Sequence, residues 1–165
     1  MTGLDQDPVV DVSVGFGHSC VVRASGALEC WGEIDDPRVF GGIGTVLQAD
    51  LPTRIASPEA IALVHGPDSA QVCVITADRG LACMGRNTEG QLGDGTYVGR
   101  TVPVSVLAAD GSPLSEVTAV SQSQLTTCAI AGDQVWCWGG NRSGQLGADT
   151  PATSPVPLRV DVPCE

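Results

Sequence analysis

The sequence predicts an all-β fold, and three observations indicate it. Short β-rich runs alternate with turn residues along the whole chain. The 165 residues include 21 glycines and 11 prolines, and one glycine-studded phrase occurs twice at a constant offset. No window shows the sustained apolar stripe of a helix. We therefore expect a single domain, or a piece of one, over residues 1–165, made of repeated β units.

The repeated phrase defines the last two units. "CMGRNTEGQLGDGT" (Cys83–Thr96) aligns with "CWGGNRSGQLGADT" (Cys137–Thr150) at an offset of 54 residues, and "VPVSV" (Val102–Val106) aligns with "VPLRV" (Val156–Val160) at the same offset. A phosphate-binding loop needs a lysine and a hydroxyl after the last glycine, or G-x-G-x-x-G between a strand and a helix. Neither phrase fits those patterns, so we interpret it as a structural corner.

A third, degenerate copy lies at the start of the chain. "HSCVVRASGALECWG" (His18–Gly32) has the cysteine pair and the "CWG", and "LPTRI" (Leu51–Ile55) resembles the later proline segments. Between them, "EIDDPRVFGGIG" replaces the corner phrase. The expected repeats cover about residues 9–56, 57–107 and 115–162.

Each unit is expected to contain a β-hairpin that places two cysteines opposite each other. In the first, Ala24–Gly26 suits a three-residue loop with a left-handed glycine. In the second, a three-residue loop at Ala77–Arg79 aligns the cysteines, whereas a four-residue loop does not. In the third, Gly132-Asp133 is typical of a type II′ turn, and its register brings the cysteine Cα atoms to about 4.5 Å, within disulfide range. The candidate disulfides are Cys20–Cys30, Cys73–Cys83 and Cys128–Cys137.

Two interpretations of the cysteines remain open. Disulfides indicate an oxidising compartment, and each would close a loop of about ten residues, worth about 2–3 kcal/mol. Alternatively, reduced cysteines pack as small apolar side chains between strands. The N-terminal "MTGLDQDPVV" has neither a positive nor an apolar region, so no signal peptide is visible. Cys164 is the odd cysteine, either free or paired beyond this chain.

The glycines and asparagines of the corner phrase suit a tight corner with positive φ. Leu92 and Leu146 would be its apolar anchors. The expected structural corner residues are Asn87, Gly90, Gln91, Leu92 and Gly93, with Asn141, Gly144, Gln145, Leu146 and Gly147 in the next unit.

The charge balance narrows the class of partner. Eight Lys and Arg residues stand against 19 Asp and Glu, for a net charge of -11. A nucleic-acid binder needs a basic stripe, which this sequence lacks, and we see no stretch suited to membrane insertion. The acidic balance favours a cationic or neutral protein partner.

Together, the repeated hairpin "HSCVVRASGALECWG", the corner "CWGGNRSGQLG" and the following "SPVPLRV" resemble the repeat of the regulator of chromosome condensation family. The resemblance covers nearly the whole chain. It implies β-propeller blades, each a four-stranded antiparallel sheet. Three blades are fewer than the four to eight of a closed ring, which leaves an arc of a longer protein, assembly of copies, or a short degenerate form. Open edges invite pairing, so self-assembly is one expectation.

The sequence departs from the family pattern at three positions of the later units. His18 keeps the histidine that precedes the first cysteine, but Gln71 and Thr126 stand at the equivalent positions, and Met84 replaces the tryptophan of "CWG". We expect His18 to make a structural hydrogen bond. His65 lies beside Gly66-Pro67, a pair typical of turns, and is expected to be solvated.

No catalytic, cofactor or metal site is predicted. Eight or nine residues separate the paired cysteines, not the two to four of a zinc knuckle. Acidic turns such as "DDP" are too short for a calcium loop. The serines lack a nucleophile elbow. Trp31 and Trp138 share the "CWG" position and are expected to pack between blades. Trp136 lies outside that pattern and is the candidate partner contact.

We therefore predict a non-catalytic protein–protein interaction module that binds through variable loops. The variable segments are Glu33–Ala49, Tyr97–Thr101, Ala108–Ser115 and Ser121–Gln124. The family resemblance implies partners such as small GTPases, chromatin or, in a secreted bacterial member, β-lactamases. It suggests a bacterial protein that is extracellular or at the cell envelope, with a cytoplasmic location as the alternative. The competing functions are a guanine-nucleotide exchange factor and an accessory repeat of a larger enzyme.

Overall fold

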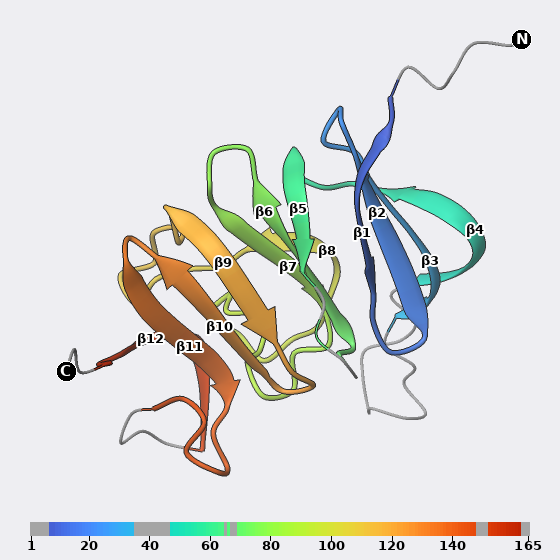
Figure 1. Ribbon diagram of the computed structural model, residues 1–165. Helices are drawn as coiled ribbons and strands as arrows, with labels where there is room; N and C mark the ends of the chain where they lie inside the picture. Colours follow the sequence, from blue (N-terminus) through green and yellow to red (C-terminus); the bar gives the residue numbers. More distant parts are fainter. Residues whose placement is uncertain (1–6, 35–46, 65, 67–68, 148–151, 163–165) are drawn as a thin grey trace, which may run out of the picture.

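The structure is a computed structural model that describes residues 7–34, 47–64, 66, 69–147 and 152–162. These residues form three four-stranded antiparallel sheets, which lie side by side in chain order (Figure 1). Each sheet is one propeller blade, and its strands are hydrogen-bonded in sequence order. The all-β expectation is confirmed. The described residues include no helix that is long and apolar enough to cross a membrane.

In each blade, the first strand lies at the inner edge of the arc and the fourth strand lies at the outer edge. Blade 1 contains β1 (Val9–Val14), β2 (His18–Arg23), β3 (Leu28–Ile34) and β4 (Leu47–Ile55). Blade 2 contains β5 (Ala60–Val64), β6 (Gln71–Thr76), β7 (Leu81–Gly85) and β8 (Arg100–Ser105). Blade 3 contains β9 (Val117–Gln122), β10 (Thr126–Ala131), β11 (Gln134–Gly140) and β12 (Thr153–Val160). The innermost strands touch across the blade boundaries, β1 with β5 and β5 with β9.

Because side chains alternate along a strand, each blade has two faces. We call the face toward the preceding blade the leading face and the face toward the following blade the trailing face. In blade 2 the leading face is Val72, Val74, Ala82 and Met84, and the trailing face is Cys73, Ile75, Leu81 and Cys83. Both faces are covered, so every residue of β6 and β7 is buried.

The apolar core consists of the two blade interfaces. Between blades 1 and 2, the trailing face of blade 1 packs against the leading face of blade 2 around Met84. Between blades 2 and 3, Trp138 takes the equivalent place and packs with Leu92 and Val106. Burial of these side chains from water is the main stabilising contribution to the arc.

The hairpins have the registers expected from their loop lengths. The cysteines of each unit face each other across the two central strands of the blade. Their S–S distances are 2.13, 2.01 and 2.13 Å, in chain order. The type of the third turn differs from the expectation: φ is positive at both Gly132 (54°) and Asp133 (58°). This is the pattern of a type I′ turn, not II′, and its twist matches that of the flanking strands. Aspartate tolerates the left-handed conformation better than most residues.

The glycine that ends each "C-x-G" triplet is required by a close backbone approach. A Cβ atom at Gly139 would lie 2.3 Å from the carbonyl oxygen of Leu125, and φ there is 96°. Gly32 and Gly85 have the same surroundings. The ladder register shifts at the preceding residue, which is the tryptophan or methionine that points toward the neighbouring blade.

Two further expectations from the sequence differ from the structure, and three fall outside the residues that it describes. The loop expected at Ser121–Gln124 begins later, because β9 continues to Gln122. Trp31 is only half-buried, because the described residues contain no blade in front of its leading face. His65, Cys164 and most of Glu33–Ala49 lie outside the described residues.

Candidate functional site

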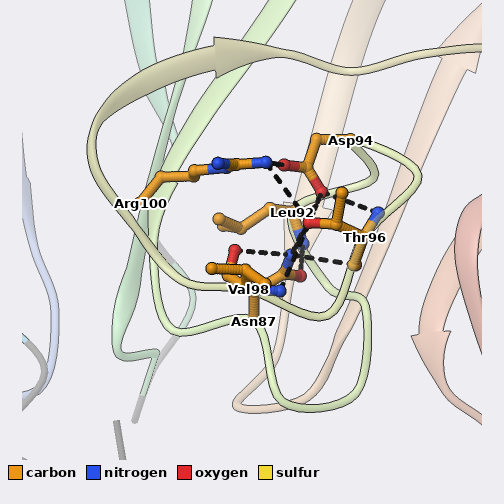
Figure 2. A network of polar contacts seen from close by, with 6 residues as sticks. All are labelled: Asn87, Leu92, Asp94, Thr96, Val98 and Arg100. Atoms are coloured by element: carbon orange, nitrogen blue, oxygen red, sulfur yellow. Dashed lines mark hydrogen bonds and ion pairs between the residues drawn. The ribbon is translucent and has the colours of Figure 1, made fainter. Parts of the chain in front are cut away.

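The corner after β7 is held by a single asparagine side chain (Figure 2). The Asn87 Oδ1 atom accepts a hydrogen bond from the Leu92 N–H at 2.9 Å. Its Nδ2 group donates to Asp94 Oδ1 at 3.1 Å and to the carbonyl oxygens of Thr96 and Val98 at 3.0 and 3.1 Å. One buried amide therefore fixes the backbone at three places on a segment without regular strand structure.

A buried carboxylate completes this cluster. The Thr96 N–H and hydroxyl donate to Asp94 Oδ1 at 3.0 and 2.7 Å, and Arg100 contacts Oδ2 through Nε at 2.7 Å and Nη2 at 2.6 Å. Burial alone would raise the pKa of Asp94, but the hydrogen bonds from Thr96 and Arg100 bring that pKa below its usual value of 3.8. Asp94 is therefore ionised at neutral pH, as a carboxylate that accepts hydrogen bonds from Asn87, Thr96 and Arg100 should be.

The same segment is fixed to blade 3. The Gly95 N–H donates to the carbonyl oxygen of Pro155 at 3.0 Å. The hydroxyl groups of Tyr97 and Thr153 are 3.2 Å apart. We call residues 94–100 of blade 2 the pinned loop, since both its own cluster and the neighbouring blade hold it.

The pinned loop presents apolar side chains to solvent. Tyr97 and Val98 are 50% and 52% exposed. An ion pair also crosses the blade boundary, with Arg142 Nη2 3.0 Å from Glu89 Oε1; the Arg142 side chain is 72% exposed and the Glu89 side chain 14%. Exposed tyrosine and arginine side chains are typical of the residues that dominate protein-binding surfaces.

The expected corner residues form two separate corners, one in blade 2 and one in blade 3. In blade 3, Asn141 Oδ1 accepts the Leu146 N–H at 2.8 Å, which repeats the bond between Asn87 and Leu92. Both leucines are fully buried. Blade 3 has alanine at the position of Asp94, and that part of the corner lies outside the described residues.

Sequence reasoning missed Asp94, Thr96 and Arg100 as a cluster. The repeat alignment gave no signal for Asp94, because alanine replaces it in the other copy. The spacing of an Asx-type turn in "DGT" was an available signal. From the sequence, Tyr97–Thr101 is recognisable only as a variable segment.

The candidate partner contact Trp136 packs mainly inside the molecule. Its indole lies against the core between blades 2 and 3, and its N–H donates to the Ala131 carbonyl oxygen at 3.2 Å. The side chain is partly exposed. Contact of that exposed part with a partner stays a prediction.

The described residues offer little acid–base or metal chemistry. They include no group of three or more His, Cys, Asp or Glu side chains placed to hold a metal ion. His18 is 3% exposed, and its Nδ1 atom lies 3.2 Å from the Phe16 carbonyl oxygen. Burial lowers the pKa of His18, and the smaller effect of that hydrogen bond opposes the shift. His18 thus makes the structural hydrogen bond that its place in the repeat predicts.

Comparisons with known proteins agree with the repeat architecture. Models of the regulator of chromosome condensation (RCC1) repeat match residues 133–163 and 9–33. The ultraviolet-B receptor UVR8 of Arabidopsis thaliana is 30% identical over 97% of this chain. The E3 ubiquitin-protein ligase HERC2 of Homo sapiens is 28% identical over 92% of it. The chain spans 36% of UVR8 and 3% of HERC2.

Solved structures give the same fold at lower identity. Human WBSCR16 superposes with a TM-score of 0.75 at 21% identity, over 95% of this chain and 39% of WBSCR16. Yeast RCC1 (Prp20), in its complex with Kap60, superposes with a TM-score of 0.74 at 19% identity, over 96% and 36% of the two chains. Three blades, the repeated corners and both family matches lead to one conclusion: the chain belongs to the RCC1 (regulator of chromosome condensation) repeat family.

Proposed function

We propose that this chain is a non-catalytic protein–protein interaction module whose pinned loop contacts the partner. The observation that carries this proposal is the combination of rigidity and exposure. The Asn87–Asp94–Arg100 cluster fixes the backbone, while Tyr97 and Val98 are about half exposed. A pre-organised loop loses little conformational entropy on binding, and tyrosine is enriched among residues that dominate interface energies.

The partner is expected to be a protein with a cationic or neutral contact surface. The net charge of -11 disfavours acidic partners and nucleic acids at long range. Prp20p of Saccharomyces cerevisiae, which has a similar fold, binds Gsp1p and histones. The likeness is one of fold, so the partner of this chain is expected to be selected by its own loops.

Substitution of Tyr97 tests the proposal. Proteins retained by the immobilised wild-type chain from extracts of its source are compared with those retained by Tyr97→Ala. We expect the variant to bind its specific partner at least about tenfold more weakly, a typical loss for a central interface tyrosine. The affinity of the identified partner is then measured by calorimetry.

Val102→Ala is the matched control. Val102 is 45% exposed on β8, outside the pinned loop. The proposal fails if Tyr97→Ala and Val102→Ala retain the same proteins with the same affinity as the wild type.

The alternative of a guanine-nucleotide exchange function rests on fold similarity. Prp20p, whose structure study describes binding to Gsp1p, is 18% identical to this chain, and such a likeness shows the fold alone. A nucleotide-release assay over a panel of small GTPases distinguishes the two functions, since only an exchange factor accelerates release.

We also propose an oxidising location, extracellular or at the cell envelope. The three S–S pairs support it, because disulfides persist in such compartments. Alkylation of the protein in its native host, before and after reduction, tests this. Six additional labels after reduction are expected, and full labelling without reduction would favour the cytoplasmic alternative.

A further inference from the structure

The charged side chains of blades 2 and 3 are divided unequally between the two ends of the blades. The hairpin turns between the second and third strands lie at one end, which we call the turn end, and the corners lie at the other, which we call the corner end (Figure 1). Exposed acidic side chains gather at the turn end, and they are Glu59, Asp78, Asp110, Glu116 and Asp133. The turn end of these blades is therefore acidic, as the net charge of the chain suggests.

The corner end of the same blades has the opposite balance. The charged residues that the structure describes there are Arg86, Glu89, Asp94, Arg100 and Arg142. Both acidic side chains lie in ion pairs and are largely buried, Asp94 at 5% exposure and Glu89 at 14%. Their partners Arg100 and Arg142 are 36% and 72% exposed. Within the described part of this end, solvent therefore meets guanidinium groups more than carboxylates.

The ion pair of Glu89 with Arg142 lies on the same surface as the pinned loop. A Cβ atom at Gly140 would lie 3.8 Å from the Glu89 Cβ atom. Gly140 pairs with Thr153 in the ladder between β11 and β12, and the Thr153 hydroxyl is 3.2 Å from the Tyr97 hydroxyl. A continuous series of contacts across the boundary between blades 2 and 3 thus joins the ion pair to Tyr97.

The exposure of this surface is compatible with further blades. Tyr97 and Val98 belong to blade 2, which is followed by blade 3, and they are still 50% and 52% exposed. Arg142 occupies the corner position that Thr88 occupies one repeat earlier, and Thr88 is exposed although a blade follows it. A blade packed behind blade 3 would therefore leave Arg142 accessible. We call Tyr97, Val98 and Arg142 the boundary patch.

The chemistry of the boundary patch favours a particular contact group. A guanidinium has five N–H donors in a planar fork, and the described polar contact of Arg142 is one bond from Nη2 to Glu89 Oε1 at 3.0 Å. The high exposure of Arg142 leaves other donors of the fork accessible to a partner. Carboxylates match this fork in geometry and charge. A carboxylate beside an apolar side chain therefore complements Arg142 together with Tyr97 and Val98.

We propose that the boundary patch binds an acidic segment of the protein partner. An Asp or Glu carboxylate of that segment pairs with Arg142, and a neighbouring apolar side chain packs on Tyr97 and Val98. This inference rests on the proposed function, because it names the group that the pinned loop and its surroundings recognise.

The negative net charge and the basic patch act over different distances. The net charge of -11 favours a partner that is neutral or cationic as a whole. Charges on exposed groups are largely screened beyond about 8–10 Å at physiological ionic strength. The exposed Arg142 therefore decides which side chain of the partner is preferred at contact, while the net charge acts on the approach of the whole partner.

Selection from a phage-displayed library of short random peptides tests the inference with a defined probe. Peptides that bind the immobilised chain and are lost on Tyr97→Ala are ligands of the pinned loop. We expect these peptides to be enriched in Asp and Glu beside apolar residues, relative to the unselected library. No enrichment, or enrichment of Lys and Arg, overturns the inference and leaves the proposed function standing. If no selected peptide depends on Tyr97, both fail.

Two variants of the ion pair give effects of opposite sign, measured by calorimetry with a Tyr97-dependent peptide. Arg142→Gln removes the guanidinium and should weaken binding roughly fivefold, as loss of one charge-assisted contact would. Glu89→Gln frees Arg142 from its internal carboxylate and should strengthen binding. The reverse pair of signs would mean that a cation of the peptide meets Glu89, and it overturns the inference. Arg142→Gln that binds as tightly as the wild type overturns it as well.

Arg159→Gln is the matched control. Arg159 also forms an exposed ion pair, with its Nη2 atom 3.2 Å from Asp161 Oδ1, but it lies near the turn end of β12. This variant changes the net charge by the same amount as Arg142→Gln, so its affinity for the peptide is expected to match that of the wild type. Equal losses in the two variants would show that overall charge attracts acidic peptides, and would refute a role for the boundary patch.

Discussion

At the scale of single residues, polar side chains with no catalytic role determine the shape of the candidate binding surface. Asn87 and Asp94 are almost fully buried, and both have hydrogen-bond partners in residues 92–100. A buried polar group that loses its partners is costly. These bonds therefore oppose rearrangement of the loop that displays Tyr97.

Replacing Asp94 by asparagine should destabilise the protein in a pH-dependent way. The ion pair with Arg100 is lost, so we expect the free energy of unfolding at pH 7 to fall by about 1–3 kcal/mol. Because the pKa of Asp94 is lowered on folding, its carboxylate contributes stability above its unfolded pKa of 3.8. That contribution disappears as the pH falls through the folded value.

Urea denaturation between pH 7 and about pH 2 measures this difference. The gap between wild type and Asp94→Asn should shrink toward low pH. Asp133→Asn is the control, since Asp133 is exposed in the turn between β10 and β11 and asparagine also tolerates its left-handed conformation. A gap that stays constant with pH would contradict an electrostatic role for Asp94.

At the scale of elements, the two copies of the corner phrase have the same geometry and different surroundings. Gly90 and Gly144 both have positive φ, 82° and 75°. Only Gly90 packs against a neighbouring strand. The corner is therefore formed by its own backbone and side-chain bonds, and its contacts depend on whether a blade follows.

The pair of variants Gly90→Ala and Gly144→Ala separates these contributions. Both pay for a left-handed alanine, about 1 kcal/mol. Gly90→Ala also forces a methyl group against the backbone of Pro155, so we expect a loss of stability larger by at least about 1 kcal/mol. Thermal unfolding under conditions in which both variants are monomeric provides the comparison. Equal losses would mean that blade 3 does not constrain this corner.

Much at this scale follows from local sequence. The loop lengths of the hairpins set the cysteine register, because side chains on paired strands alternate with a fixed period. The type of the third turn did not follow, because both residues of Gly132-Asp133 tolerate positive φ and the twist of the strands decided between the two turns. The Asp94 cluster could not be predicted from the repeat either, because the other copy of the corner phrase has Ala148 at the position of Asp94.

At the scale of the whole molecule, the three blades are similar units in different environments. Within the described residues, the middle blade is covered on both faces, and each of the other two is covered by a blade on one face. The position in the arc, more than the residue type, sets the exposure of equivalent side chains. Val22 is fully buried in blade 1, while Ile130 in blade 3 is 42% exposed.

This difference in coverage between the blades predicts the order in which the three disulfides are reduced. The Cys20–Cys30 and Cys73–Cys83 sulfurs lie on covered faces and are fully buried, whereas Cys128 on the open face is partly exposed. A mild reductant under native conditions should open Cys128–Cys137 first, because thiolate attack requires access to a sulfur atom. Alkylation followed by mass spectrometry measures the order. Simultaneous reduction of all three disulfides would contradict a difference in access.

The sequence by itself determined the all-β class, the three repeated units, the hairpin registers and the corner phrase. These features depend on side-chain periodicity, loop length and the conformational freedom of glycine, all of which act over a few residues. Only the tertiary structure decided which faces are covered, where Trp31 and Trp138 differ, and how Asp94 pins the loop that displays Tyr97. Those properties depend on which blade lies next to which. Local sequence cannot specify them, because the same residue type is buried or exposed according to its neighbour.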